Sequence, residues 1–85
     1  MIHKSIEIKS EEGLHARVAS LFVKTCTKFK SDIYIEKDNI QINAKSIMGI
    51  IALGALKGDV ISVIVNGYDE EEAMKAIEEF LENLE

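Results

Sequence analysis

Apolar and polar residues alternate along four stretches of the chain, and a period of two predicts β-strands. The four stretches are residues 2–8, 33–36, 40–44 and 60–65. Polar residues 37–39 join the second stretch to the third, which predicts a hairpin with a short turn. The fourth stretch is mostly apolar on both of its faces, so we expect it near the centre of a sheet.

Three further stretches are predicted to be helices, and the first and last of them repeat their apolar residues every three or four positions, as amphipathic helices do. They lie near residues 16–29, 46–53 and 69–84. Ser46 is a favoured N-cap residue and Gly54 a typical helix stop, so the middle helix should be short. Asp69, with Glu72 three residues later, predicts a start resembling a capping box for the last helix.

The resulting order β-α-β-β-α-β-α predicts one α+β domain over residues 1–85. We expect an open-faced sandwich, in which an antiparallel sheet carries its three helices on one face. In so small a domain the other face of the sheet must meet solvent. The residues expected on that face are Lys4, Glu7, Tyr34, Glu36 and Gln41.

Composition excludes several classes of protein. With 47% hydrophobic and 29% charged residues, the 85-residue chain is too apolar to be disordered. Cys26 is the only cysteine, which excludes an internal disulfide and a Cys-rich zinc site. No apolar run reaches the roughly 18 residues that span a bilayer, and the first residues lack the features of a signal peptide. We therefore expect a cytoplasmic protein without membrane insertion.

The net charge of −5 is unevenly distributed. Residues 69–85 carry eight acidic side chains and only Lys75 as a base, whereas residues 1–68 carry nine basic and seven acidic side chains. A basic docking site is therefore compatible with an acidic chain.

His15 is the first candidate for chemistry because it directly precedes the first predicted helix. The unpaired N–H groups of Ala16, Arg17 and Val18 favour a neutral, nucleophilic ring, and they suit an anion such as a phosphoryl group. The Arg17 guanidinium suits bidentate binding of phosphate oxygens. The alternative is that His15 serves only as a solvent-exposed helix cap, and its position alone leaves both interpretations open.

A narrow basic stripe leads away from His15 on the first predicted helix. Arg17, Lys24 and Lys28 project on one side, next to Leu21. The simpler interpretation is a solvated charged face, but the stripe is continuous with the corner formed by His15 and Arg17.

The predicted helix over residues 46–53 is apolar all the way round. A short helix in a small domain cannot bury every side, so some of Ile47, Met48, Ile50 and Ile51 should be exposed together and mark a partner surface. The alternative is a more deeply seated helix. Ser46 at its N-cap is also a sensible phosphorylation site, because a dianion is favoured at a helix N-terminus.

Other chemistry is not supported. His3, His15 and Cys26 lack the spacing of metal ligands, and Cys26 lies on an apolar stripe, so we expect neither a metal site nor thiol catalysis. No Gly-rich phosphate loop is present, and we expect no cofactor. The basic stripe is too short and too poor in aromatic residues for a nucleic-acid surface.

Two segments carry a resemblance to a known family. Gly13-Leu14-His15-Ala16-Arg17, and Asn43-Ala44-Lys45-Ser46-Ile47-Met48-Gly49-Ile50 thirty residues later, resemble the HPr family. Its members are the histidine-containing phosphocarriers of the bacterial phosphoenolpyruvate:sugar phosphotransferase system. The resemblance covers essentially the whole chain and implies an open-faced sandwich with a four-stranded antiparallel sheet and three helices.

The resemblance also implies a function. His15 would accept a phosphoryl group on Nδ1 from Enzyme I and pass it to a sugar-specific Enzyme IIA, as a stoichiometric carrier rather than an enzyme. Arg17 and the Ala16 N–H would steady the phosphoryl group. Ser46 would be a regulatory site for an ATP-dependent HPr kinase/phosphorylase, and its phosphorylated form would pair with a catabolite-control transcription factor.

The residues expected to contact partner proteins are Ser20, Leu21, Lys24, Lys28, Ile47, Met48 and Ile51. We expect a monomer. Two positions depart from the family pattern: Val18 stands where proline is usual, and Glu12 stands where a small polar residue is common. Glu12 places a negative charge close to His15.

Two alternative functions remain open. One is a regulatory binding module of HPr type that acts through phosphorylation of Ser46 and transfers no phosphoryl group through His15. The other is a carrier with the same chemistry in a nitrogen-related or dihydroxyacetone-kinase phosphorelay.

Overall fold

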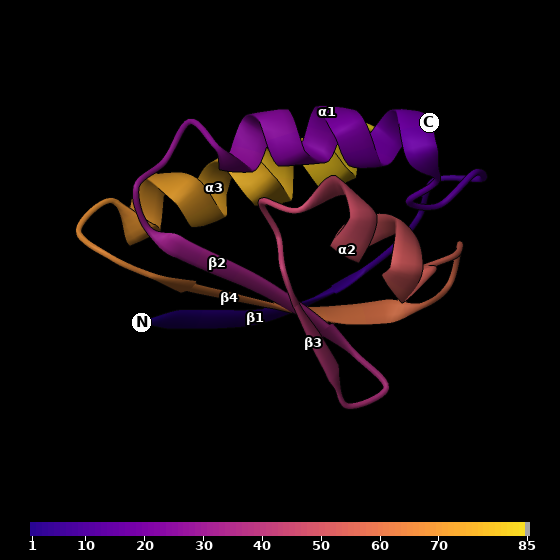
Figure 1. The fold of residues 1–85 in the computed structure, drawn as a ribbon, viewed down its shortest axis with the longest axis horizontal. Coiled ribbons are helices and arrows are strands. Elements are labelled where there is room, and N and C mark those ends of the chain that lie inside the picture. The colour runs from indigo at the N-terminus through magenta and orange to yellow at the C-terminus, as the bar shows by residue number, and fades with distance from the viewer. Residues whose placement is uncertain (85) are drawn as a thin grey trace.

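Within residues 1–84, which the computed structural model describes, four strands and three helices follow one another in the predicted order. The strands are β1 (Ile2–Glu7), β2 (Asp32–Lys37), β3 (Ile40–Asn43) and β4 (Val60–Asn66). The helices are α1 (Ala16–Cys26), α2 (Ile47–Leu53) and α3 (Glu70–Glu82). All three helices lie on one side of the sheet, so the α+β open-faced sandwich is confirmed (Figure 1).

The sheet has the strand order β1-β4-β2-β3, and each neighbouring pair is antiparallel. β4 therefore lies inside the sheet, as its apolar sequence predicts. Its residues Ile61, Val63 and Val65 are fully buried beneath the helices, whereas Ser62 and Ile64 on the opposite face are only half-buried. This alternation follows from the pleat of the strand, which sends successive side chains to opposite faces.

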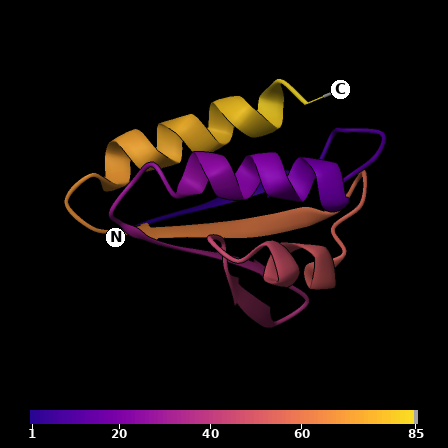
Figure 2. The same cartoon turned by 45° about the horizontal axis from the view of Figure 1, so that its top comes forward.

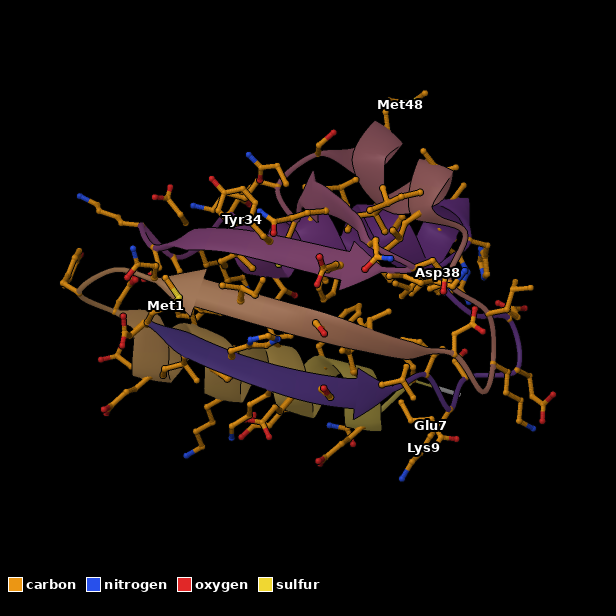
Figure 3. The ribbon with its side chains drawn as sticks, turned by 90° about the horizontal axis from the view of Figure 1, so that it is seen from below. Met1, Glu7, Lys9, Tyr34, Asp38 and Met48 are labelled. Carbon is orange, nitrogen blue, oxygen red and sulfur yellow. The ribbon has the colours of Figure 1, made fainter. Side chains whose placement is uncertain are left out.

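Figure 3 looks onto the uncovered face of the sheet, where Glu7 and Tyr34 lie as predicted. The prediction for Lys4 was wrong. Lys4 pairs with the buried Val63 and therefore starts on the helical side of the sheet, and its ammonium group donates to Glu78 of α3 at 2.9 Å. Because β1 is an edge strand, the long Lys4 side chain reaches past the sheet to the charged flank of α3.

The core lies between the sheet and the helices. α1 buries Val18, Ala19, Phe22, Val23 and Cys26, and α3 buries Ala73, Met74, Ile77 and Leu81. The ring of Phe22 packs against Phe80, with 5.5 Å between ring centroids. Phe29, the last residue of the first predicted helical stretch, packs against the core but lies beyond the C-cap of α1 at Thr27.

Asp69 does not cap α3 with its side chain, contrary to the predicted capping-box-like start. Its carboxylate accepts hydrogen bonds from the N–H groups of Lys30 and Ser31, each at 2.9 Å, and from the Ser31 hydroxyl. The buried Ser31 requires an acceptor, and Asp69 supplies it from across the fold. Glu70 instead accepts from the N–H of Gly67 at 3.1 Å.

Candidate functional site

His15 occupies the N-cap of α1, where its extended backbone (φ −78°, ψ 178°) precedes the first helical residue, Ala16. The preceding residue, Leu14, is buried, and its N–H donates to the carbonyl oxygen of Ala55 at 2.9 Å. Gly13 has φ +65°, and a Cβ there would lie 2.5 Å from the same Ala55 oxygen, so glycine is required for this approach. These contacts fix the start of α1 against the segment that follows α2.

Both ring nitrogens of His15 have partners on the chain. Nδ1 accepts a hydrogen bond from the backbone N–H of Arg17 at 3.3 Å, and Nε2 contacts the Glu12 carboxylate. An ionised carboxylate only accepts, so Nε2 carries the proton and Nδ1 presents its lone pair. The hydrogen bonds therefore select the neutral Nε2–H tautomer, with Nδ1 directed at the N-terminus of α1.

Glu12 links the two predicted phosphoryl-binding residues. The carboxylate oxygen that contacts His15 also accepts from the Arg17 guanidinium at 3.2 Å. The hydrogen bond from His15, followed by that from Arg17, lowers the pKa of Glu12, so the carboxylate is ionised at neutral pH. The sequence predicted a charge near His15 but not this bridge. The signal for it is the three-residue spacing across the turn at residues 11–12.

The cap interpretation and the chemical interpretation of His15 are compatible. A cap uses only the acceptor at Nδ1, and His15 provides it. Capping alone does not require the carboxylate of Glu12 and the guanidinium of Arg17 beside the ring. The side chain of His15 is about one-third exposed, at 36%, so a phosphoryl donor can approach it. Ala16 is the first helical residue, and its N–H has no acceptor within the helix.

Ser46 caps α2, as the sequence predicts. Its backbone is extended (φ −112°, ψ 113°), and its hydroxyl oxygen accepts from the N–H of Gly49 at 3.1 Å. Gly54 ends the helix in the left-handed conformation at φ +66°. The half-buried Ser46 side chain is thus part of the helix start.

α1 and α2 pack side by side and run in opposite directions (Figure 2). At one end, Leu14 bonds to Ala55 just after α2, and at the other, the ammonium group of Lys45 donates to the carbonyl of Phe29 at 2.7 Å. His15 therefore lies near the end of α2, and Ser46 near the end of α1. The two residues therefore lie at opposite ends of the helix pair.

The predicted contact residues are exposed on these two helices. They comprise Ser20, Leu21 and Lys24 of α1, Lys28 just beyond it, and Ile47, Met48 and Ile51 of α2, and we call this set the α1–α2 surface. Met48 is 75% exposed and projects from α2 in Figure 3. Ile50 and Leu53 are buried, so one side of α2 packs against the core and the other side is exposed to solvent.

The remaining candidates offer no further chemistry. Burial raises the pKa of the Cys26 thiol to about 12, which removes it as a nucleophile at neutral pH. Among residues 1–84 no cluster of three or more His, Cys, Asp or Glu side chains is arranged to hold a metal ion. Over the same residues, no helix is long and apolar enough to cross a membrane. A surface pocket lined by residues 67–72 includes no predicted site residue.

Comparison with known proteins gives full-length matches. The family described as "PTS HPr component phosphorylation site" matches residues 2–83. The HPr-like protein Crh of Halalkalibacterium halodurans is 48% identical over 82 residues, covering 96% of this chain and 98% of that protein. The phosphocarrier protein HPr of Neisseria meningitidis is 43% identical, covering 95% of this chain and 91% of that protein.

Solved structures of HPr proteins are also similar to this chain. HPr-C-His from Thermoanaerobacter tengcongensis is 54% identical and superposes with a TM-score of 0.93, covering 96% of this chain and 92% of that chain. An HPr dimer from the same organism is also similar, with a TM-score of 0.77, covering 96% of this chain and 94% of that chain. The match over nearly the entire length, together with the fold, shows that the chain belongs to the HPr family of phosphocarrier proteins of the phosphotransferase system.

Proposed function

We propose that this chain, as a single HPr-like domain, accepts a phosphoryl group from Enzyme I on Nδ1 of His15 and passes it to sugar-specific Enzyme IIA. The observation that carries the proposal is the hydrogen bonding of the His15 ring. Its proton is held on Nε2, and its Nδ1 lone pair lies at the N-terminus of α1. An unprotonated nitrogen is the required nucleophile, and the helix end favours the incoming anion.

The site suits a residue that accepts a phosphoryl group and then releases it. A phosphoryl group on Nδ1 would displace the long Arg17 N–H contact and receive hydrogen bonds from the N–H groups of Ala16 and Arg17. The exposed guanidinium of Arg17 adds a flexible, charge-assisted partner. Such a site binds the group loosely, as a carrier requires, since it must surrender the group to the next protein. The chain then acts as a stoichiometric intermediate without a cofactor or its own turnover.

Partners would dock on the α1–α2 surface. It combines the lysines of α1 with the exposed apolar side chains of α2, and it suits partner proteins whose contact surface is apolar with an acidic rim. The acidic helix α3 lies on the other side of α1 (Figure 2), so its negative charge is kept away from this surface. Docking there brings the partner's reactive group to the His15 end of α1.

Ser46 is proposed as the regulatory site for an HPr kinase/phosphorylase. A phosphate there adds about −1.5 to −2 charge at the N-cap of α2. Because Ser46 begins α2 and His15 lies near the other end of that helix, the added charge acts first on the α1–α2 surface beside Ser46. It would weaken docking of an acidic-rimmed Enzyme I and create a feature that a catabolite-control transcription factor could recognise.

One observation favours a second candidate function. The chain is 48% identical to an HPr-like protein Crh, and a solved Crh that is 38% identical is named a catabolite repression HPr, which supports a regulatory module, proposed here to act through Ser46. A carrier in a non-sugar phosphorelay would use the same His15 chemistry with other partners. We propose a cytoplasmic monomer, and the dimeric relative makes the oligomeric state a property to measure.

The test is an intact-mass measurement after incubation with Enzyme I, magnesium and phosphoenolpyruvate. We expect one acid-labile phosphoryl group on the parent chain and none on His15→Ala. Both samples require an Enzyme I shown to be active on another HPr. An unmodified parent chain under these conditions would contradict the carrier function and favour the Ser46 module, which a kinase and ATP would then test.

A further inference from the structure

The Glu12 carboxylate bonds to both His15 and Arg17, the two residues proposed to handle the phosphoryl group. We infer that Glu12 is a positioning residue for phosphoryl transfer at His15: it holds the ring in the Nε2–H tautomer and balances the charge that the ring gains when Nδ1 is phosphorylated. The inference rests on the proposed carrier function and deepens it.

The local backbone places Glu12 for this role. The N–H of Gly13 donates to the carbonyl of Ser10 at 3.1 Å, which closes a turn and directs Glu12 towards the start of α1. The neighbouring Glu11 points elsewhere and pairs with Lys57. Two adjacent carboxylates of equal charge are thus separated by the turn, and only one of them reaches the histidine.

The bonding pattern fixes which nitrogen reacts. The Glu12 carboxylate can only accept a hydrogen bond, so Nε2 of the ring must donate to it. The Arg17 backbone N–H can only donate, so Nδ1 of the ring must accept from it. Both contacts therefore support the Nε2–H tautomer. An unconstrained neutral imidazole would exchange between two tautomers, one of which blocks Nδ1 with a proton. A carboxylate that orients a histidine in this way is a recurring device for presenting the opposite nitrogen.

The charge balance follows from the transfer step. The Nδ1 lone pair forms the new P–N bond while the bond between phosphorus and its donor atom breaks and leaves its electron pair on the donor. The ring keeps its Nε2 proton and becomes positively charged. The Glu12 carboxylate already bonded to that N–H neutralises the new charge, and the bond changes from a neutral donor to a cationic one, which strengthens it.

Glu12 also keeps Arg17 close without obstructing Nδ1. Only one guanidinium nitrogen contacts the carboxylate, at 3.2 Å, and a guanidinium has five N–H donors. The remaining donors are available to the oxygens of a phosphoryl group on the ring.

The test uses the full chain labelled with ¹⁵N and the variants Glu12→Gln, Glu12→Ala and Glu11→Gln. Nitrogen chemical shifts of His15 at a pH where the ring is neutral report the tautomer directly. Phosphorylation rates are measured by intact mass with phosphoramidate, a small donor whose P–N bond breaks to release ammonia after proton uptake from water. Glu11→Gln changes the net charge equally and is the matched control.

In the parent chain and in Glu11→Gln we expect the Nε2–H tautomer to predominate. Glu12→Gln retains an acceptor, so it should keep this tautomer but react about three- to tenfold more slowly, a modest factor because the pair is exposed and screened. Glu12→Ala should show mixed tautomers and the slowest reaction. Glu11→Gln should react within about twofold of the parent.

The inference is overturned if the parent ring carries its proton on Nδ1, or if Glu12→Ala leaves the tautomer unchanged. A Glu12 variant that reacts as fast as Glu11→Gln, or faster, would also overturn it and make Glu12 a repulsive neighbour of the phosphoryl group. Phosphoramidate needs no protein donor, so these outcomes are distinct from a failure of Enzyme I to phosphorylate the chain.

Discussion

At the scale of single residues, the two nitrogens of His15 have different surroundings. Nε2 faces a carboxylate, and Nδ1 faces the backbone N–H of Arg17 at the start of α1. The backbone that creates this asymmetry depends on Gly13, whose positive φ and close approach to Ala55 no other residue can match without displacement. The chemistry of the ring is thus set by its neighbours in the chain rather than by burial.

The role of Arg17 in binding the phosphoryl group can be tested by substitution. Arg17→Ala should slow acceptance of phosphoryl from Enzyme I by about 10- to 100-fold, because a charge-assisted partner of the phosphate is lost. Arg17→Lys should be intermediate, since an ammonium keeps the charge without the bidentate fork. A quenched time course read by intact mass measures both. Lys75→Ala on α3 is the control, and equal rates for Arg17→Ala and the control would refute the role.

At the scale of elements, the period of the apolar residues predicted the four strands and the helices α1 and α3, and local cap residues predicted both ends of α2. The errors concern side chains whose partners lie on other elements. Lys4 bonds to Glu78 of α3, and Asp69 bonds to Ser31 instead of its own helix. Such partners depend on tertiary placement, which a local pattern does not contain. The bridge from Glu12 to His15 was missed for a related reason, because it depends on a turn of irregular backbone.

The cap of α2 gives a prediction for an element. Ser46→Ala should lower the free energy of unfolding by about 1 kcal/mol, because the Gly49 N–H loses its acceptor. Ser46→Asp should remain close to the parent, since aspartate is an equally favoured N-cap residue and its charge suits the helix end. Urea denaturation measures both variants. Equal stability of Ser46→Ala and the parent would show that the cap contributes nothing.

At the scale of the whole molecule, Asp69 joins the start of α3 to the connection between α1 and β2. The hydrogen bond from the Ser31 hydroxyl, followed by that from the Lys30 N–H, lowers the pKa of Asp69 below its usual 3.8. A group whose pKa is lower in the folded state stabilises the fold above its unfolded pKa. That contribution is lost as the pH falls through the folded value.

Asp69→Asn should therefore be less stable than the parent at neutral pH, and the difference should shrink as the pH falls below about 4. Urea midpoints measured at several pH values would show the two curves converging. Other carboxylates with lowered pKa values, among them Glu70 and Asp59, remain in both proteins, so both should still lose stability in acid. A difference independent of pH would mean that the ionised carboxylate is not the source of the stabilisation.

The central claim is that Nδ1 of His15 carries the phosphoryl group, and ¹⁵N NMR of the labelled chain after phosphorylation by Enzyme I and phosphoenolpyruvate tests it most directly. We predict that phosphorus couples to Nδ1 of His15, that Nε2 keeps its proton, and that the group leaves when Enzyme IIA is added. Phosphorus on Nε2, on His3 or on a hydroxyl group would contradict the account, as would a phosphohistidine that Enzyme IIA cannot discharge.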